Sequence, residues 1–131
     1  MKTKVLILDD EQIVGERLKA SLELAGFTVD AFSSSREALQ KLEEESYDIL
    51  VTDLKMSGPD GMEVLRAARQ MRPGIKSVVI TGFATKDTAE EAMRSGAVKF
   101  IAKPFKMSDL KKLLMTLSGI IDNEDPSGSN E

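Results

Sequence analysis

The sequence contains no cysteine, no histidine and no tryptophan. The lack of cysteine excludes a disulfide framework, a thiolate metal site and a cysteine nucleophile. The lack of histidine excludes a serine–histidine triad, a histidine-bound zinc ion and a phosphohistidine carrier. Any chemistry that this chain performs therefore depends on carboxylates, hydroxyls, amines and the backbone.

Positive charge is in short supply. The chain has 18 Lys and Arg against 22 Asp and Glu, which gives a formal net charge of -4. Affinity for a nucleic-acid backbone comes from Lys and Arg that displace counterions, and the chain has neither a basic helix nor a helix-turn-helix pattern. We therefore expect no direct nucleic-acid contact. The nucleotide-binding patterns GxxxxGK[ST] and GxGxxG are also absent.

Long hydrophobic runs are missing as well. No apolar stretch approaches the length that spans a membrane. The apolar run inside MKTKVLILDD is too short for a signal peptide, and no small-residue cleavage site follows it. These features predict a cytoplasmic protein that makes no membrane contact.

What the chain does have is short apolar runs that alternate with amphipathic segments. The runs fit strands that are covered on both faces, and they occupy 5–8, 28–32, 49–52, 77–80 and 98–102. The first helical pattern carries Ile13, Leu18, Leu22 and Ala25, with Gly26 as its left-handed cap. The second predicted helix is 34–42, with Ser34 and Glu37 as a capping box, and the third is 61–71. The fourth is 86–95, with Ala89, Ala92 and Met93 on its apolar face and Gly96 as its cap. The last runs from the cap Ser108 to about Ile121.

The order of these segments is strand then helix, repeated five times. Strict alternation predicts a parallel sheet with helices on both faces, an α/β doubly wound fold. The strand order can be 3-2-1-4-5 or the flavodoxin-like 2-1-3-4-5, and the lack of a glycine-rich phosphate turn favours the second. The length of 131 residues suits one domain, which we place at 1–121. Residues 122–131 are polar and contain Pro, Gly and Ser, so we predict a disordered tail or the start of a linker.

Polar residues stand directly after the apolar runs. Asp9 and Asp10 follow the first run, Asp53 the third, Thr81 the fourth and Lys103 the fifth. In the 2-1-3-4-5 order the ends of the first and third strands flank the ligand crevice, so three carboxylates should face it. Such a group repels itself unless a hard cation such as Mg²⁺ neutralises it, with the carboxylates and a carbonyl after Asp53 as ligands.

Each of these residues has an ordinary explanation when taken alone. An aspartate pair after a strand usually begins a helix or forms a turn. Thr81 before Gly82 is typical of a turn, and Lys103 of a protein surface. Phe100, inside the last strand, is more often a core residue than a moving part. Together they suggest more: the metal would neutralise charge on an incoming phosphoryl group, Lys103 and the Thr81 hydroxyl would add donors, and a carboxylate can form an aspartyl phosphate. This hypothesis of a phosphoryl-transfer site rests on all five polar residues together.

Four separated motifs closely resemble the receiver domains of two-component response regulators. They are LILDDE, DILVTDLKMSGPDGMEVL, VVITGFAT and GAVKFIAKPF, and the resemblance covers about residues 3 to 121. It implies the flavodoxin-like order, as in the chemotaxis member of the family that is a known example of this order. It also implies a role for each matching residue. Asp53 would accept the phosphoryl group, and Asp9, Asp10, Asp53 and the Lys55 carbonyl would hold Mg²⁺, or Mn²⁺ in its place. Thr81 and Lys103 would bind the phosphoryl oxygens, and Phe100 would move with Thr81. Lys103–Pro104 would be a cis peptide, and Met56 would line the entrance near the phosphate.

The chain departs from the family pattern in one loop. The family usually has proline directly after the residue that corresponds to Met56, whereas this chain has Ser57 there and Pro59 two residues later. That difference bears on the loop shape and on the lifetime of the phosphoryl group. The segment TGFAT, followed by AEEAMRSGA, most resembles receivers that precede ATPase-type transcriptional activators or that belong to hybrid kinases.

Three functions remain open on this basis. In the first, the domain is a switch rather than an enzyme, and it catalyses only its own Mg²⁺-dependent phosphorylation and dephosphorylation. A sensor histidine kinase, a phosphotransfer protein or an acyl phosphate would donate the phosphoryl group. A downstream effector domain or protein would respond to it. The resemblance also allows a homodimer on phosphorylation. The second is an aspartyl-phosphate phosphatase, but such enzymes usually have an aspartate where this chain has Lys55. The third is a degenerate, non-phosphorylated interaction module.

Overall fold

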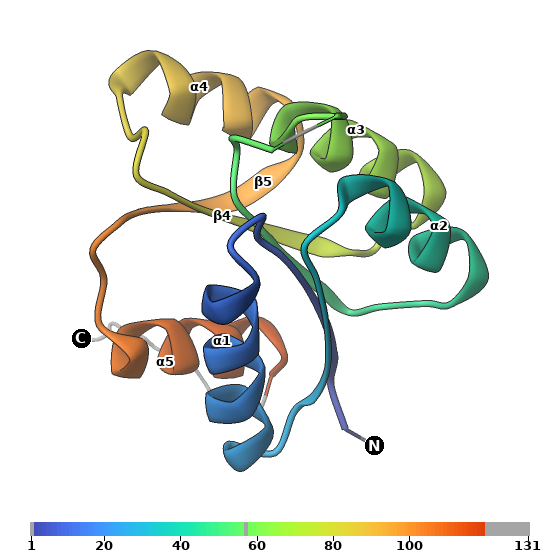
Figure 1. Ribbon diagram of the computed structural model, residues 1–131, viewed down its shortest axis with the longest axis vertical. Helices are drawn as coiled ribbons and strands as arrows, with labels where there is room; N and C mark the ends of the chain where they lie inside the picture. The colour runs from blue at the N-terminus through green and yellow to red at the C-terminus, as the bar shows by residue number, and fades with distance from the viewer. Residues whose placement is uncertain (1, 57, 120–131) are drawn as a thin grey trace.

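Strands and helices alternate along the residues that the structure, a computed structural model, describes, namely 2–56 and 58–119 (Figure 1). The elements are β1 (Lys4–Leu8), α1 (Gln12–Leu24), β2 (Thr28–Phe32), α2 (Ser35–Glu44), β3 (Ile49–Thr52), α3 (Gly61–Met71), β4 (Lys76–Thr81), α4 (Lys86–Arg94), β5 (Ala97–Ala102) and α5 (Met107–Leu117). All neighbouring strands pair in parallel, in the order β2-β1-β3-β4-β5. The predicted doubly wound sheet of order 2-1-3-4-5 is confirmed.

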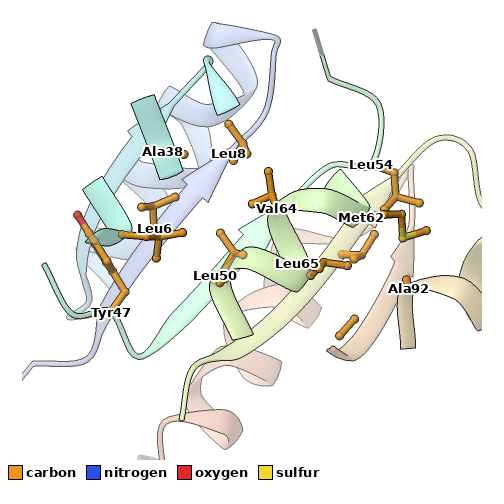
Figure 2. Packing of buried hydrophobic residues seen from close by; sticks show 14 residues of the cluster. Leu6, Leu8, Ala38, Tyr47, Leu50, Leu54, Met62, Val64, Leu65 and Ala92 are labelled. Carbon is orange, nitrogen blue, oxygen red and sulfur yellow. The ribbon is translucent and has the colours of Figure 1, made fainter. Parts of the chain in front are cut away.

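The sheet separates two hydrophobic layers. Helices α1 and α5 cover one face, and α2, α3 and α4 cover the other (Figure 1). Alternate side chains of a strand point to opposite faces. Leu6 and Leu50 accordingly pack with Leu65 under α2 and α3 (Figure 2), whereas Val5 and Ile7 pack beneath α1 and α5. The central strands are therefore covered on both faces, and only their ends reach solvent.

The last strand is less covered than its sequence predicts. β5 lies at the edge of the sheet and pairs only with β4. Val98 is 41% exposed, although it belongs to an apolar run like those of the buried strands. Apolar composition alone therefore does not distinguish a central strand from an edge strand.

Two helix faces are also rotated from the prediction. Ile13 is 59% exposed, and the buried stripe of α1 runs instead through Val14, Leu18 and Leu22, at spacings of four. On α4, Ala92 is buried whereas Met93 is 48% exposed. The prediction placed Ile13 on the buried face of α1 and grouped Met93 with Ala92 because these residues are apolar. Whether an apolar residue on a helix is buried depends on how the helix packs against the sheet, and apolar character alone does not decide it.

The boundaries of α5 differ from the prediction too. Ser108 is not the cap, because the first turn forms on the Lys106 carbonyl and places Ser108 inside the helix. The helix ends at Leu117, rather than at Ile121, and Gly119 follows in the left-handed conformation with φ 81°. Ile121 and the predicted tail at 122–131 lie outside the described residues.

The caps of the other helices are partly those expected. The Ser34 side chain accepts a hydrogen bond from the Glu37 backbone amide at 3.3 Å, as predicted. Gly26 and Gly96 both adopt positive φ after α1 and α4. A full capping box that was not predicted joins Asp60 and Glu63 at the start of α3. It fixes the beginning of α3 beside the loop that follows β3.

A buried tyrosine gives the fold a dependence on alkaline pH. The Tyr47 hydroxyl donates to Asp30 Oδ2 at 2.5 Å, and only 4% of the residue is exposed. Burial, and then the bond to Asp30, raise the pKa of Tyr47 above its ordinary 10.0. Above that pH the unfolded chain loses a proton that the folded chain keeps, so the free energy of unfolding should fall as pH rises. In urea unfolding at about pH 9 to 11, we expect a smaller fall for Tyr47→Phe than for the parent; equal falls would contradict this assignment.

Candidate functional site

The polar residues predicted from the strand ends meet at the edge of the sheet formed by the carboxyl-terminal ends of its strands. Asp9 follows β1 and Asp53 follows β3, and these strands end in register because Leu8 pairs with Thr52. The Asp53 backbone amide continues the pairing by donating to the Leu8 carbonyl at 3.0 Å. On the neighbouring strands, the Lys103 amide donates to the Thr81 carbonyl at 2.8 Å. Parallel pairing thus carries four of the predicted side chains to the same edge.

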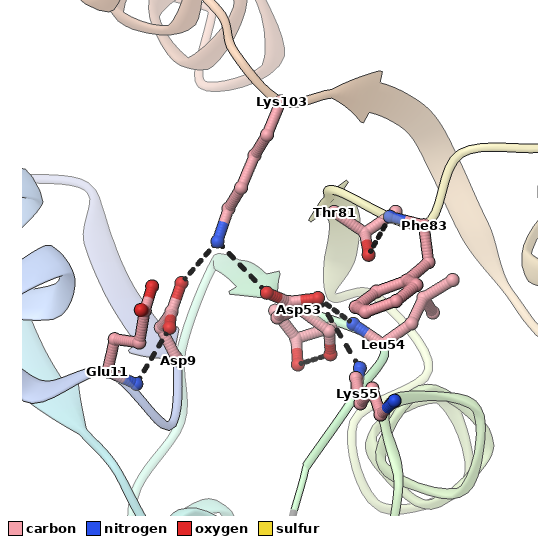
Figure 3. A network of polar contacts seen from close by, with 9 residues as sticks. Asp9, Glu11, Asp53, Leu54, Lys55, Thr81, Phe83 and Lys103 are labelled. Carbon is pink, nitrogen blue, oxygen red and sulfur yellow. Dashed lines mark hydrogen bonds and ion pairs between the residues drawn. The ribbon is translucent and has the colours of Figure 1, made fainter.

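The Lys103 ammonium lies between two of the carboxylates. Its Nζ is 3.0 Å from Asp9 Oδ2 and 3.0 Å from Asp53 Oδ2 (Figure 3). The carboxylate side chains are only 6% and 10% exposed, and that of Lys103 is 24% exposed. Burial acts to lower the pKa of Lys103, but the hydrogen bonds to Asp53 and Asp9 outweigh it, and the pKa is raised. The ammonium therefore stays charged and compensates two buried anions.

Backbone amides hold the other oxygen of each carboxylate. Asp53 Oδ1 accepts from the Leu54 amide at 2.6 Å and from the Lys55 amide at 3.4 Å. Asp9 Oδ1 accepts from the Glu11 amide at 2.9 Å. Each carboxylate is thereby fixed between a loop backbone on one side and the ammonium on the other (Figure 3). Such a fixed anion is well placed to act as a nucleophile or as a ligand.

Asp10 does not join this group. Its side chain is exposed and, with Asp53, Lys55, Phe83 and Lys103, it lines an open hollow of about 420 Å³. Within residues 2–56 and 58–119 no three acidic side chains gather closely enough to hold a metal ion. Three carboxylates were expected to come together, and two of them do. The ammonium of Lys103 draws Asp9 and Asp53 together.

The donor types around the hollow nevertheless fit a hard cation. The carboxylates of Asp10 and Asp53 both line it, and oxygen ligands of this kind are those that Mg²⁺ and Ca²⁺ prefer. Lys55 belongs to the same lining. Of the predicted ligands, Asp10, Asp53 and Lys55 therefore border one hollow, whereas Asp9 is not part of its lining.

The Thr81 hydroxyl is held by a backbone amide. Thr81 is fully buried, and its Oγ1 accepts from the Phe83 amide at 3.1 Å (Figure 3). Phe100, the other predicted moving residue, is half-buried and packs against the core layer beneath α2 and α3. Met56 packs against the same layer, whereas Ser57 lies outside the described residues. The Lys103–Pro104 peptide bond is cis, as the resemblance implies.

Several contacts at this edge were not predicted. The Phe83 ring is 54% exposed and stacks under the Lys55 ammonium, with Nζ 4.6 Å from the ring centroid, so the two side chains form one wall of the hollow. The only sequence signal for Phe83 is an aromatic residue in the turn after a strand. The Thr52 hydroxyl and Gly61 also contact the backbone beside Asp53. Nothing in the sequence distinguishes them from ordinary strand and helix residues.

Known proteins resemble this chain over nearly all of its described length. A family model described as the response regulator receiver domain matches residues 5–115. The C4-dicarboxylate transport transcriptional regulatory protein DctD of Rhizobium meliloti is 37% identical over 101 residues, which cover 77% of this chain and 22% of DctD. The chain thus spans less than a quarter of that relative.

Solved structures agree with this match. A CheY-like receiver domain from Methanospirillum hungatei is 30% identical, has a TM-score of 0.85, and the match covers 91% of this chain and 96% of that one. A response regulator from Burkholderia pseudomallei, with a phosphorylated aspartic acid, a calcium ion and citrate, is 27% identical, with a TM-score of 0.80 and coverage of 91% and 71%. The chain therefore belongs to the receiver domains of response regulators, the phosphorylation-dependent signalling switches of two-component systems.

Proposed function

We propose that Asp53 accepts the phosphoryl group and that this domain is a working switch rather than a degenerate module. The observation that carries the proposal is the fixed Asp53 carboxylate. It borders an open hollow, one of its oxygens is held by two backbone amides, and Lys103 contacts the other. The phosphorylated aspartic acid of the Burkholderia pseudomallei protein supports the same chemistry on this fold.

The transfer itself needs few protein groups. An oxygen of Asp53 bonds to phosphorus while the bond between phosphorus and the donor breaks, and the leaving group keeps the electron pair. The donor is a phosphohistidine of a sensor kinase or phosphotransfer protein, or an acyl phosphate. A leaving imidazole takes a proton from solvent, and a leaving carboxylate departs as the anion. The protein thus catalyses its own modification and has no separate substrate to turn over.

A divalent cation fits the acidic side of the hollow. The carboxylates of Asp10 and Asp53 and the carbonyl of Lys55 would hold Mg²⁺, or Mn²⁺ in its place, with Asp9 acting directly or through water. The cation would supply positive charge that offsets the charge of the transferring phosphoryl group. The calcium ion in the Burkholderia pseudomallei protein supports a divalent site in this fold.

Lys103 and Thr81 respond to the new charge. The Lys103 ammonium, which contacts the Asp9 and Asp53 carboxylates, would then pair with a phosphoryl oxygen. The Thr81 hydroxyl would give up the Phe83 amide and donate to another phosphoryl oxygen. Phe100 would follow Thr81 and change the surface of α4, β5 and α5. Phosphorylation would thereby shift an equilibrium between two conformations of that surface.

The changed surface would be read by a downstream effector domain or protein. DctD is a much longer transcriptional regulator, which supports an effector of that class, and a homodimer on phosphorylation is a further outcome of the same change. Among residues 2–56 and 58–119 there is no helix with the length and apolarity that crossing a membrane demands. We infer a cytoplasmic location from the histidine-kinase donor. Direct contact with nucleic acid would belong to the effector rather than to this acidic domain.

The test is intact-mass measurement after incubation with acetyl phosphate and Mg²⁺. We expect a gain of one phosphoryl group, which disappears when the metal is chelated with EDTA before the donor is added. If no mass is gained at any donor concentration, the degenerate interaction module is favoured instead. A phosphatase would show multiple turnover of small phosphate esters without a lasting mass gain.

Metal binding can be measured separately by fluorescence. The natural fluorophore, Tyr47, precedes β3, whereas Asp53 follows it, so the two lie at opposite ends of that strand. Since the chain has no tryptophan, Phe83→Trp would place a single strong fluorophore on the wall of the hollow. We expect its emission to change with Mg²⁺ and this response to be lost in the Asp10→Asn background.

A further inference from the structure

The peptide unit that joins Asp53 to Leu54 is held from two sides. On one side, the Thr52 hydroxyl donates to the Asp53 carbonyl at 2.8 Å, and Thr52 is completely buried. On the other side, Gly61, the first residue of α3, approaches so closely that a Cβ would lie 2.3 Å from that carbonyl oxygen and 2.6 Å from Leu54 Cα. A side chain at position 61 would therefore push this peptide unit out of place.

The same peptide unit also orients the phosphoryl acceptor. A trans peptide is planar, and its C=O and N–H bonds point in opposite directions. Fixing the direction of the Asp53 carbonyl thus fixes the direction of the Leu54 N–H. That N–H donates to Asp53 Oδ1 at 2.6 Å, the shortest of the contacts made by this carboxylate (Figure 3). The orientation of the carboxylate therefore depends on the groups that hold the peptide plane.

The start of α3 makes this support rigid. The Gly61 amide donates to the Leu54 carbonyl at 2.9 Å, so the loop is tied to the first turn of the helix. The Asp60–Glu63 capping box fixes this first turn of the helix. Gly61 does not have positive φ, so backbone conformation does not require glycine there; the lack of a side chain serves close approach alone.

We propose that Thr52 and Gly61 are positioning residues for Asp53. Together they hold the Asp53–Leu54 peptide plane, so that the Leu54 N–H fixes Oδ1 and leaves Oδ2 to Lys103 and the incoming phosphoryl group. This inference rests on Asp53 being the acceptor, but the geometry of the peptide plane is independent of phosphorylation. The two can therefore fail separately.

The experiment compares the parent with Thr52→Val, Thr52→Ser and Gly61→Ala. Valine has nearly the shape of threonine but no hydroxyl, serine restores the hydroxyl, and alanine adds the methyl group that would meet the Asp53 carbonyl. The first readout is the exchange rate and the nitrogen–proton NMR shift of the Leu54 amide in the absence of any phosphoryl donor. The second is the rate constant for phosphorylation by acetyl phosphate. Ser77→Ala, which removes a buried hydroxyl from the start of β4, controls for general destabilisation.

In Thr52→Val and Gly61→Ala we expect the Leu54 amide to exchange about fivefold to tenfold faster and phosphorylation to slow by a similar factor. Thr52→Ser should match the parent, and Ser77→Ala should change neither readout selectively. An unchanged Leu54 amide in both Thr52→Val and Gly61→Ala would overturn the inference, even if phosphorylation slowed. If the parent is not phosphorylated, the role of Asp53 fails, and the Leu54 amide alone still decides whether the peptide plane is held in this way.

Discussion

Replacing Asp53 with asparagine is expected to abolish the phosphoryl gain while leaving the fold intact. An amide nitrogen or oxygen cannot form the acyl phosphate, but the amide has the size of the carboxylate, and its oxygen can still accept from the Leu54 amide. Lys103 keeps Asp9 as a partner, so we expect the free energy of unfolding to change by about 1 kcal/mol or less. The measurements are intact mass after exposure to acetyl phosphate and Mg²⁺, and urea unfolding.

The matched control is Asp109→Asn, which makes the same change of charge at an exposed position on α5. It should be phosphorylated like the parent. A phosphoryl gain in Asp53→Asn equal to that of Asp109→Asn would mean that another residue is the acceptor. A loss of gain in both variants would point to an effect of net charge on the reaction rather than to the acceptor.

Replacing Lys103 with methionine is expected to have a large effect on both stability and phosphorylation. The change leaves the buried carboxylates of Asp9 and Asp53 facing each other without the ammonium that lies 3.0 Å from each. Breaking such a pair strongly destabilises a protein, but Lys103 is partly exposed, and water would offset part of the loss. We therefore expect a loss of about 2–3 kcal/mol, measured by urea unfolding at neutral pH.

The rate of phosphorylation by acetyl phosphate should fall by about a hundredfold in Lys103→Met, because a fixed positive charge near the transferring group is lost. Lys99→Met, which removes an exposed lysine from β5, provides the control and should change little. Adding Asp9→Asn to Lys103→Met should recover part of the lost stability, since it removes one of the two facing anions. If the double variant is less stable than Lys103→Met, the two carboxylates are not the cause of the loss.

The sequence predicted the architecture and the convergence of the site for the same reason. Parallel strands have a common direction, so a polar residue after each apolar run must lie at one edge of the sheet. Asp9, Asp53, Thr81 and Lys103 are placed there by the ends of β1, β3, β4 and β5 alone. This reasoning needs only the order of elements, and it tolerates errors of a residue or two at their boundaries.

Contacts that depend on side-chain direction were beyond such reasoning. Sequence spacing cannot tell that Lys103 takes Asp9 and Asp53 as partners and leaves Asp10 exposed, because that depends on which way each carboxylate points after its strand. The choice between Ile13 and Val14 on the buried face of α1 is set by the angle at which the helix meets the sheet. Both choices are made by packing in three dimensions.

Thr52 illustrates the limit most clearly. It ends an apolar strand, where a threonine is common, and only the structure shows that its hydroxyl reaches the Asp53 carbonyl. The same holds for Gly61, which the sequence presents as the first residue of a helix and the structure as a contact with the acceptor's backbone. Residues that support a reactive group through its backbone leave no motif of their own.

The most direct test of the central claim is to locate the phosphoryl group chemically. Borohydride reduces an acyl phosphate to the alcohol but leaves a free carboxylate unchanged. After reaction with acetyl phosphate and Mg²⁺, reduction and proteolysis, peptide mass spectrometry should therefore find homoserine at position 53 and unmodified aspartate at positions 9 and 10. Homoserine at position 9 or 10, or a phosphate that survives reduction on a serine or threonine, would contradict the assignment of Asp53 as the acceptor.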